Sequence, residues 1–391
     1  MRVIHVITRL VIGGAQENTV ASVLGLQKKL GSEKVRLISG PETGPEGSLQ
    51  ASLAAAPGTL ILIPELVRRI DPWKDLLAWR HLTRLFREQR PDIVHTHSGK
   101  AGILGRLAAH RAKTPIVVHT IHGPSFGPFQ GPLANGLFLA VERRAGRVTD
   151  HFVVVANAMA RQYLAAGIGQ PGQYTRIYSG FALKPFLSAT NDPAVRARWK
   201  IAPDDLVIGV IARLFKLKGH DDLFEITPEL VRRHPRIKFL LVGDGIWRER
   251  FEQRVKAMNM ESHFIFTGLI PPTDVPALIG IMDIVVHLSR REGLPRALPQ
   301  ALAAGRPVVA YDCDGANEVC LDNETGFLVQ PGDLRTLTEH LTRLAADAML
   351  RERLATRGRQ LVRERFDVET MVDDLYALYL KLAAERKLPT S

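Results

Sequence analysis

Cysteine is scarce in this sequence. Of 391 residues, only Cys313 and Cys320 are cysteines, and no second pair accompanies them. The chain therefore cannot contain a disulfide framework or a zinc site built from four cysteines, and this composition fits a reducing compartment.

Long apolar runs are also missing. No stretch of about 18 uninterrupted apolar residues occurs, so we expect no membrane-spanning helix. The opening run, MRVIHVITRLVIGG, is broken by His5 and Thr8 and lacks the apolar segment and cleavage site of a signal peptide. We therefore expect a cytoplasmic protein, and association with the inner face of the membrane stays open.

Acidic residues are few in the first half of the chain. Residues 1–180 contain 22 lysines and arginines against 11 aspartates and glutamates, whereas residues 181–391 contain 30 against 29. This excess fits either an ordinary basic surface or contact with an anionic partner, such as a phosphorylated acceptor or an acidic lipid surface. No RNA-recognition, zinc-finger or basic-zipper pattern is present, so we expect no nucleic-acid partner.

The sequence does contain a repeated strand-helix pattern. Its hydrophobic fraction is 46% and its charged fraction 24%, as in soluble globular proteins, and 391 residues suffice for two cores. Short apolar runs alternate with helical patterns such as 74–90 and 335–346, which predicts parallel sheets covered by helices on both faces. The predicted strands are 2–8, 34–39, 92–96, 116–120 and 152–156, followed by 206–211, 237–242, 263–266, 283–287 and 307–310.

Two such series predict an α/β fold with two Rossmann-like domains. The stretch SGFALKPFLSATNDP (179–193) mixes glycine, proline and polar residues, so the boundary should lie there. We expect an N-terminal domain over 1–184, a C-terminal domain over 185–365 and a final helical segment over 366–391. Doubly wound sheets bind ligands at the carboxyl ends of their strands, so the loops at those ends are the candidate sites.

Two of these loops carry features of a phosphate site. After the first strand, Gly13 and Gly14 lead into a helix, whose N-terminus favours an anion. After strand 206–211, Arg213 and Lys218 offer a fork of donors and a point charge, which suit a diphosphate without a metal. The alternatives are a tight turn for the glycines and two solvated surface cations for the basic pair.

The order of the remaining loop motifs is more specific. IARLFKLKG, LVGDG, FTG, EG followed by AAGRPVV, GANE and TGFLVQPGD succeed one another over residues 208–333. This set resembles the retaining glycosyltransferases of family 4, whose GT-B fold consists of two Rossmann-like domains facing each other across a cleft. RPDIVHTHSGKAGILGRLAA (90–109) and HTIHG (119–123) resemble the acceptor-binding domain of that family, so the likeness covers nearly the whole chain.

The resemblance implies donor-binding roles for residues of the second half. Arg213 and Lys218 match the clamp on the diphosphate of the nucleotide sugar. Glu292 matches the carboxylate that holds hydroxyls of the donor sugar, and the backbone of Gly293 and Leu294 would add sugar or phosphate contacts. In addition, the position corresponding to Leu269 meets the nucleobase through its main chain.

Other positions follow from the same resemblance. The turn at Gly13 and Gly14 should face the diphosphate, and His122 matches a histidine that approaches the donor sugar, a plain turn histidine being the alternative. The family has a second glutamate eight residues after the first, which grips the ribose, but this chain has Gln300. A carboxylate accepts from both ribose hydroxyls, whereas an amide accepts from one, so we expect nucleotide binding weaker by about 1–2 kcal/mol without loss of the chemistry.

The resemblance therefore implies retaining transfer of a sugar from a UDP- or GDP-linked donor to a lipid-linked or saccharide acceptor. The setting would be synthesis of cell-envelope glycan, exopolysaccharide or lipopolysaccharide. His122 and Glu292 would be the catalytic residues, with no covalent nucleophile, cofactor or metal. The alternatives are a sugar-nucleotide epimerase of the same architecture and a non-catalytic sugar-nucleotide-binding protein, for which Gln300 is the support.

Two patterns mimic metal sites. The D-x-D triplet at 312–314 has the spacing of a manganese site, but such triplets are common by chance and the cationic clamp makes a metal redundant. His95 and His97 fall on one face at the end of a predicted strand, where we expect packed or hydrogen-bonded histidines.

Residues 128–150 form a possible membrane-facing segment. A stripe of apolar residues is followed by three arginines, and a basic amphipathic helix of this kind can lie in an anionic headgroup layer. An ordinary helix packed on the sheet is the alternative. The stripe consists of Phe129, Leu133, Leu137, Phe138 and Val141, and the arginines are Arg143, Arg144 and Arg147.

Overall fold

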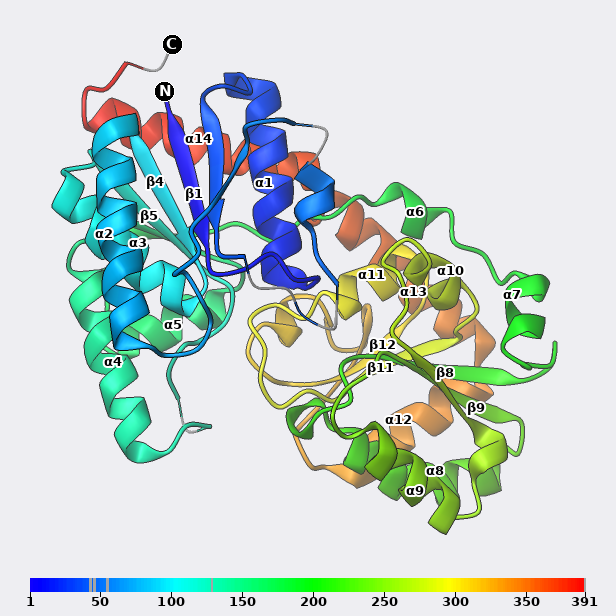
Figure 1. Cartoon of the computed structure of the whole chain (residues 1–391). Coiled ribbons are helices and arrows are strands. Elements are labelled where there is room, and N and C mark those ends of the chain that lie inside the picture. The colour runs from blue at the N-terminus through cyan, green and yellow to red at the C-terminus, as the bar shows by residue number, and fades with distance from the viewer. Residues whose placement is uncertain (42–43, 45–46, 54–55, 128, 390–391) are drawn as a thin grey trace. The chain divides into compact units, whose positions relative to one another are not determined.

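The chain forms two compact units in the computed structural model, which describes residues 1–41, 44, 47–53, 56–127 and 129–389. The first unit comprises Met1–Phe181 together with Val368–Ser391, and the second comprises Ala182–Asp367 (Figure 1). The first segment of the first unit thus ends at Phe181, three residues before 184, the expected end of the N-terminal domain. The chain returns at Val368, after α13 has ended at Arg365.

The first unit is built on a seven-stranded parallel sheet in the order β3-β2-β1-β4-β5-β6-β7. The central strands are buried on both faces, as the apolar runs in their sequences predicted, although each also carries at least one histidine. The strands are β1 (Val3–Ile7), β2 (Val35–Ser39), β3 (Leu60–Leu62), β4 (Ile93–His97), β5 (Ile116–Ile121), β6 (His151–Val154) and β7 (Tyr174–Arg176).

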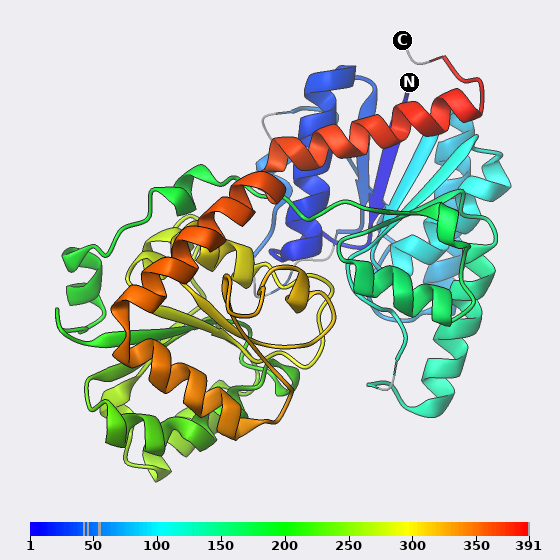
Figure 2. The same cartoon turned by 180° about the vertical axis from the view of Figure 1, so that it is seen from behind.

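Helices cover both faces of this sheet. One face packs on α1 (Gly14–Leu30) and α14 (Val368–Glu385), and the other packs on α2 (Pro72–Gln89) and α3 (Gly99–Ala112). Figure 2 shows α14, in red, lying against the first unit although it is the last helix of the chain. The remaining helices of the unit are α4 (Pro132–Gly146) and α5 (Asn157–Ala165).

The second unit has its own six-stranded parallel sheet, in the order β10-β9-β8-β11-β12-β13, and its own core. Its strands are β8 (Leu206–Ile211), β9 (Ile237–Val242), β10 (Phe264–Gly268), β11 (Ile284–His287), β12 (Val308–Tyr311) and β13 (Gly326–Val329). Its helices are α6 (Lys184–Leu187), α7 (Pro193–Arg198), α8 (His220–Arg233), α9 (Arg248–Ala257), α10 (Val275–Gly280), α11 (Ala297–Ala303), α12 (Leu334–Ala346) and α13 (Ala348–Arg365).

Three edge strands were not predicted. β3 and β7 are only three residues long and half-exposed, so they lack the continuous apolar run that identifies a buried strand. β13 lies inside the TGFLV motif and begins at a glycine, which weakens the strand signal. All three lie at the ends of the sheets, where sequence specifies pairing least.

Candidate functional site

Two loops of the second unit meet at the carboxyl ends of the neighbouring strands β8 and β11. Lys218 ends the short turn Lys216–Lys218 after β8, and Glu292 follows β11. Nζ of Lys218 forms an ion pair with Oε1 of Glu292. Their side chains are only 19% and 17% exposed, so the pair is largely shielded from water.

A glycine allows this approach. Gly219 has φ +73°, a left-handed conformation, and a Cβ at this position would lie 2.1 Å from the carbonyl oxygen of Leu288. The backbone N–H of Arg290 donates to the carbonyl of Leu217 at 2.9 Å, which ties the two loops together. Lys218 is therefore held beside the loop that follows β11, and the nearby backbone leaves no room for a side chain at position 219.

Glu292 is held as a carboxylate. Its Oε1 also lies 3.2 Å from Nε2 of His287, and its backbone N–H donates to Oδ2 of Asp314 at 2.7 Å. Burial by itself would raise the pKa of Glu292, but the hydrogen bond with His287 and the charge of Lys218 outweigh it and hold that pKa well below its usual range. The second unit therefore presents an ionised acceptor next to a cation.

The other predicted donor-side residues lie on loops or helices of the same unit. Arg213 is exposed shortly after β8, and Leu269, 51% exposed, directly follows β10. Gly293 and Leu294 are buried, and the carbonyl of Gly293 accepts from the N–H of Gly315 at 3.1 Å. Gln300 is half-buried on α11.

Sequence reasoning did not identify His287 and Asp314 as partners of Glu292. A polar residue ending the buried strand β11 was the available signal for His287. Asp314 was considered only within the D-x-D triplet, but its Oδ2 accepts from the Glu292 backbone, whereas Oδ1 of Asp312 accepts from Asn317 at 3.0 Å. The two carboxylates of the triplet thus serve different partners.

The first unit has polar groups at the carboxyl end of its sheet. Gly13 caps α1 and has extended φ, which any residue can adopt, while Gly14 is exposed. His122 is half-buried directly after β5, and its Nε2 lies 3.1 Å from Nδ1 of His97. His95 lies 2.6 Å from Oγ1 of Thr120, so the prediction that His95 and His97 are hydrogen-bonded is confirmed.

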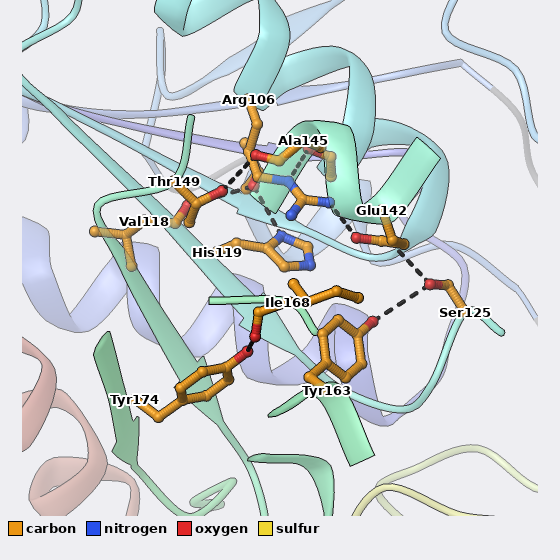
Figure 3. A network of polar contacts seen from close by, with 12 residues as sticks. Arg106, Val118, His119, Ser125, Glu142, Ala145, Thr149, Tyr163, Ile168 and Tyr174 are labelled. Carbon is orange, nitrogen blue, oxygen red and sulfur yellow. Dashed lines mark hydrogen bonds and ion pairs between the residues drawn. The ribbon is translucent and has the colours of Figure 1, made fainter. Parts of the chain in front are cut away.

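The loop that carries His122 is anchored by a buried ion pair (Figure 3). Arg106 of α3 and Glu142 of α4 are both 0% exposed, and their N···O distance is 2.7 Å. Ser125, three residues after His122, donates to the other oxygen of Glu142 at 2.8 Å. Removal of one partner would leave an uncompensated buried charge, so these contacts fix the loop and α4 together.

Helix α4 is only partly packed. Glu142, Ala145 and Gly146 near its end are buried, whereas Leu133 and Leu137 near its start are 92% and 62% exposed. In Figure 1 the beginning of α4 extends away from the first unit's sheet. The packed-helix alternative thus describes only the second half of α4. Pro128, which begins the predicted segment 128–150, lies outside the described residues.

Among the described residues, no helix combines the length and apolar character needed to cross a membrane.

Models of known families match both halves of the chain. Residues 191–361 match the family described as Glycosyl transferases group 1. Residues 14–180 match the family described as Glycosyl transferase 4-like domain. The two matched ranges contain all the predicted site residues except Gly13.

Individual relatives agree with these matches. The chain is 26% identical over 328 residues to the UDP-Gal:alpha-D-GlcNAc-diphosphoundecaprenol alpha-1,3-galactosyltransferase of Escherichia coli, covering 83% of this chain and 84% of that protein. It is 28% identical to the GDP-mannose-dependent alpha-(1-6)-phosphatidylinositol monomannoside mannosyltransferase of Mycolicibacterium smegmatis, covering 80% of this chain and 89% of that protein. The crystal structure of Anabaena HepE in complex with UDP-glucose has the same fold, with a TM-score of 0.81 at 21% identity over 97% of this chain and 100% of that chain.

Proposed function

Because the chain belongs to the group 1 glycosyltransferases of family 4 and has their two-domain Rossmann-like fold, we propose that it catalyses the following sugar transfer. It transfers a sugar, with retention of anomeric configuration, from a UDP- or GDP-linked donor to a lipid-linked or saccharide acceptor in cell-envelope glycan synthesis. The names of the E. coli and M. smegmatis relatives give one UDP-sugar and one GDP-sugar donor, and both acceptors are lipid-linked. They support the donor class and the acceptor class without choosing between the bases.

The observation that carries this proposal is the contact between Lys218 and Glu292. In a nucleotide sugar the anomeric carbon lies between the diphosphate and the sugar hydroxyls, so groups that bind the two parts must be neighbours. Lys218, a cation suited to phosphate, adjoins Glu292, an ionised acceptor suited to hydroxyls. The contacts of Glu292 with Lys218 and His287 both fall on Oε1, which leaves Oε2 to accept from the sugar.

The leaving group is the charged part of the reaction. As the bond between the anomeric carbon and the diphosphate breaks, negative charge builds up on the departing oxygen. Lys218 and Arg213 stabilise this charge, and a preorganised cation is effective because it needs no reorganisation during the step. These side chains can act without a metal or other cofactor. The departing phosphate helps remove the proton of the attacking acceptor hydroxyl on the same face of the sugar.

As the family resemblance implies, we propose that His122 contacts the donor sugar and that the turn at Gly13 and Gly14 contacts the diphosphate. In the second unit, Leu269 meets the base through its backbone, Gly293 and Leu294 add backbone contacts, and Gln300 binds one ribose hydroxyl as an acceptor. The identity of the base and of the sugar depends on these contacts.

A second part of the proposal concerns location. The exposed leucines of α4 and the arginines at its end support a peripheral contact with an anionic membrane, as a lipid-linked acceptor would require. Attachment of this kind places the first unit at the surface where such an acceptor is found.

The test is a thermal-shift and transfer experiment with UDP, GDP and their common sugar conjugates. We expect one sugar nucleotide to raise the melting temperature more than its bare nucleotide, and Glu292→Gln to remove that difference. The control is Glu324→Gln, which neutralises an exposed carboxylate in the same unit. Stabilisation by about 2.7 kcal/mol is expected at a hundred times the dissociation constant.

Absence of any shift at millimolar nucleotide would overturn the donor proposal. Transfer to an acceptor, measured with the donor so identified, separates the proposal from epimerisation and from binding without catalysis.

A further inference from the structure

The exposed apolar side chains of the first unit gather at the starts of two helices. Among the described residues of this unit, seven large apolar side chains are exposed, and six of them lie in the first two turns of α2 and α4 or just before these helices. A cluster of this kind marks an interaction surface, because water is a poor solvent for apolar groups. The six are Ile70, Trp73 and Leu77 at α2, and Phe129, Leu133 and Leu137 at α4.

The two helix starts lie at the same end of the sheet. α2 connects β3 to β4 and α4 connects β5 to β6, and each runs from the carboxyl end of the parallel sheet back to its amino end. Both connections progress in the same direction along the sheet, which places the helices on one face, and α3 contacts both of them. Figure 1 shows α2 and α4 beginning towards the lower end of the first unit. The six side chains therefore belong to one edge of this unit.

One side of α2 continues from these apolar residues into arginines. Steps of four, three, four and three residues keep a set of side chains on the same side of a helix. The buried residues of α2 lie on the opposite side, against the core. The helix thus presents an apolar first half and a basic second half to its surroundings. The exposed set is Trp73, Leu77, Arg80, Arg84 and Arg87.

α4 repeats this pattern at the same spacing. Leu133 and Leu137 begin its exposed side, Ala140 follows, and Arg144 and Arg147 end it. Two helices with the same order of apolar and basic residues, on the same face of one sheet, fit a partner that is extended and flat. A bilayer has this shape, and it offers an apolar layer beneath an anionic one.

The arginines of α2 also line a groove beside α3. Its volume is about 460 Å³, a usual size for a site that binds a small molecule or headgroup. Glu88 is the one carboxylate of the lining and pairs with Arg84 at 2.7 Å, so positive charge is in excess. Guanidinium groups match the geometry of phosphate oxygens, and phosphate is therefore the chemistry that this lining recognises. The arginines are Arg80, Arg84, Arg87 and Arg111, and the half-buried Trp79 forms part of the wall.

We propose that the outer sides of α2 and α4 form one membrane-binding surface, in which Trp73 and the other exposed apolar side chains enter a bilayer and the arginines of α2 hold phosphates of anionic lipids. The charge of the unit is complementary to such a bilayer, since residues 1–180 contain 22 lysines and arginines against 11 aspartates and glutamates. Tryptophan is also typical of the boundary between headgroups and acyl chains. A soluble phosphate compound would account for the groove but not for the apolar edge beside it.

The surface extends beyond the contact proposed above for α4. The α4 part rests on that proposed location, whereas α2 adds Trp73 and the arginine groove on observations of its own. Attachment also orients the first unit. The apolar edge is the carboxyl end of the sheet, where the loop with His122 follows β5, so a lipid-linked acceptor would meet the unit at the edge that enters the bilayer. This last step depends on the proposed function, but lipid binding does not.

The experiment is sedimentation of the full-length protein with vesicles of phosphatidylcholine, alone or mixed with phosphatidylglycerol. We expect binding that requires phosphatidylglycerol and weakens with salt. A triple variant, Arg80→Gln with Arg84→Gln and Arg87→Gln, should bind on the order of a hundredfold more weakly, because each basic residue near an anionic surface contributes roughly fivefold.

The matched control removes the same charge from the second unit. Arg232→Gln with Arg233→Gln and Arg236→Gln changes three exposed arginines there and should retain most of the vesicle binding. Folding of each variant is checked by the thermal shift with the donor nucleotide. The α2 variant should match the wild type in that shift, because Lys218 and Glu292 belong to the other unit.

Tryptophan fluorescence tests the apolar edge separately. Lipids brominated in their acyl chains quench a tryptophan that reaches the apolar layer. We expect quenching in the wild type and its loss in Trp73→Phe, which changes a side chain that is 71% exposed. Trp199→Phe, at a half-buried position of the second unit, should leave the quenching unchanged. If the triple arginine variant fails to fold, this measurement still decides.

Equal vesicle binding by the wild type and the α2 arginine variant, or quenching that persists in Trp73→Phe, would overturn the proposal. Binding of inorganic phosphate that the arginine variant loses, without any binding to vesicles, would replace the membrane by a soluble anion. A protein that binds vesicles through α2 but binds no nucleotide would reject the proposed transferase function alone.

Discussion

At the residue scale, the second unit relies on an unusual carboxylate. Glu292 is largely shielded from water, yet Lys218 and His287 keep it ionised. A shielded carboxylate with a matched cation costs little to reorganise when a ligand replaces water around it. The same pairing makes the two residues mutually dependent, so removal of either leaves the other without its partner charge.

Gln300 gives the most direct residue-scale prediction. Gln300→Glu restores a carboxylate that accepts from both ribose hydroxyls, so we expect about tenfold tighter binding of the nucleotide, or 1–2 kcal/mol. Calorimetric titration with UDP and GDP measures the change. Gln330→Glu adds the same charge at an exposed position of the same unit and should change affinity little. Equal affinity of wild type and Gln300→Glu would place the ribose away from α11.

The buried histidines predict a pH dependence of stability. Burial lowers the pKa of His5 to about 3, and it lowers the pKa of His95, His97 and His119 well below the usual value. In the unfolded chain these histidines bind protons near pH 6.5, whereas in the folded chain they stay neutral. Their contribution to the free energy of unfolding is therefore fully present above pH 6.5 and is lost as the pH falls. Each such histidine contributes a slope of about 1.4 kcal/mol per pH unit.

Urea unfolding between pH 7.5 and 5.0 measures this slope. His119→Gln should reduce it by the contribution of one histidine, whereas His110→Gln, at an exposed position, should not change it. A free energy of unfolding that stays constant from pH 6.5 to 5.0 would contradict the prediction.

At the element scale, the loop between β8 and α8 depends on Gly219. Gly219→Ala adds a Cβ 2.1 Å from the Leu288 carbonyl in a left-handed conformation, so the loop must move and carry Lys218 away from Glu292. We expect a loss of about 1–3 kcal/mol in the free energy of unfolding, together with weaker binding of the nucleotide. Gly172→Ala, where a Cβ meets nothing within 4 Å, is the control. If Gly219→Ala binds the nucleotide as tightly as the wild type does, Lys218 does not belong to the donor site.

From the exposed leucines at the start of helix α4 we predict membrane association. Leu133→Glu with Leu137→Glu places charge on side chains that are 92% and 62% exposed, so the core is untouched. We expect several-fold weaker sedimentation with anionic liposomes, because the apolar face no longer enters the headgroup layer. Met349→Glu changes an equally exposed side chain of the second unit and serves as the control. Binding that is unaffected by these substitutions and by salt would exclude α4 as the contact.

At the scale of the whole molecule, the chain passes from the first unit to the second and back. A fragment of residues 182–367 contains a complete sheet and core, so we expect it to fold cooperatively and to be stabilised by the nucleotide. Circular dichroism and thermal shift measure both properties. Residues 1–181 alone lack α14, whose Leu375 and Tyr379 pack in the first unit's core, and should not fold stably. A well-folded 1–181 fragment would show that α14 is dispensable.

Much of the architecture was predictable because it depends on local patterns. The ten predicted strands match β1, β2, β4, β5 and β6 of the first unit and β8 to β12 of the second, with ends that differ by at most two residues. Continuous apolar runs identify strands buried on both faces, and the loop motifs follow from where such strands end. The short edge strands carry no such run, so their existence depends on the neighbour with which they pair.

The sequence by itself determined the two α/β series, the glycosyltransferase likeness and the candidate residues Lys218 and Glu292, because these rest on periodicity and on ordered motifs. Only the tertiary structure decided which groups touch. His287 and Asp314 meet Glu292 through neighbouring loops, and Tyr379 joins His5 from a helix at the other end of the chain. Contacts of this kind depend on distances between residues remote in sequence, which no local pattern encodes.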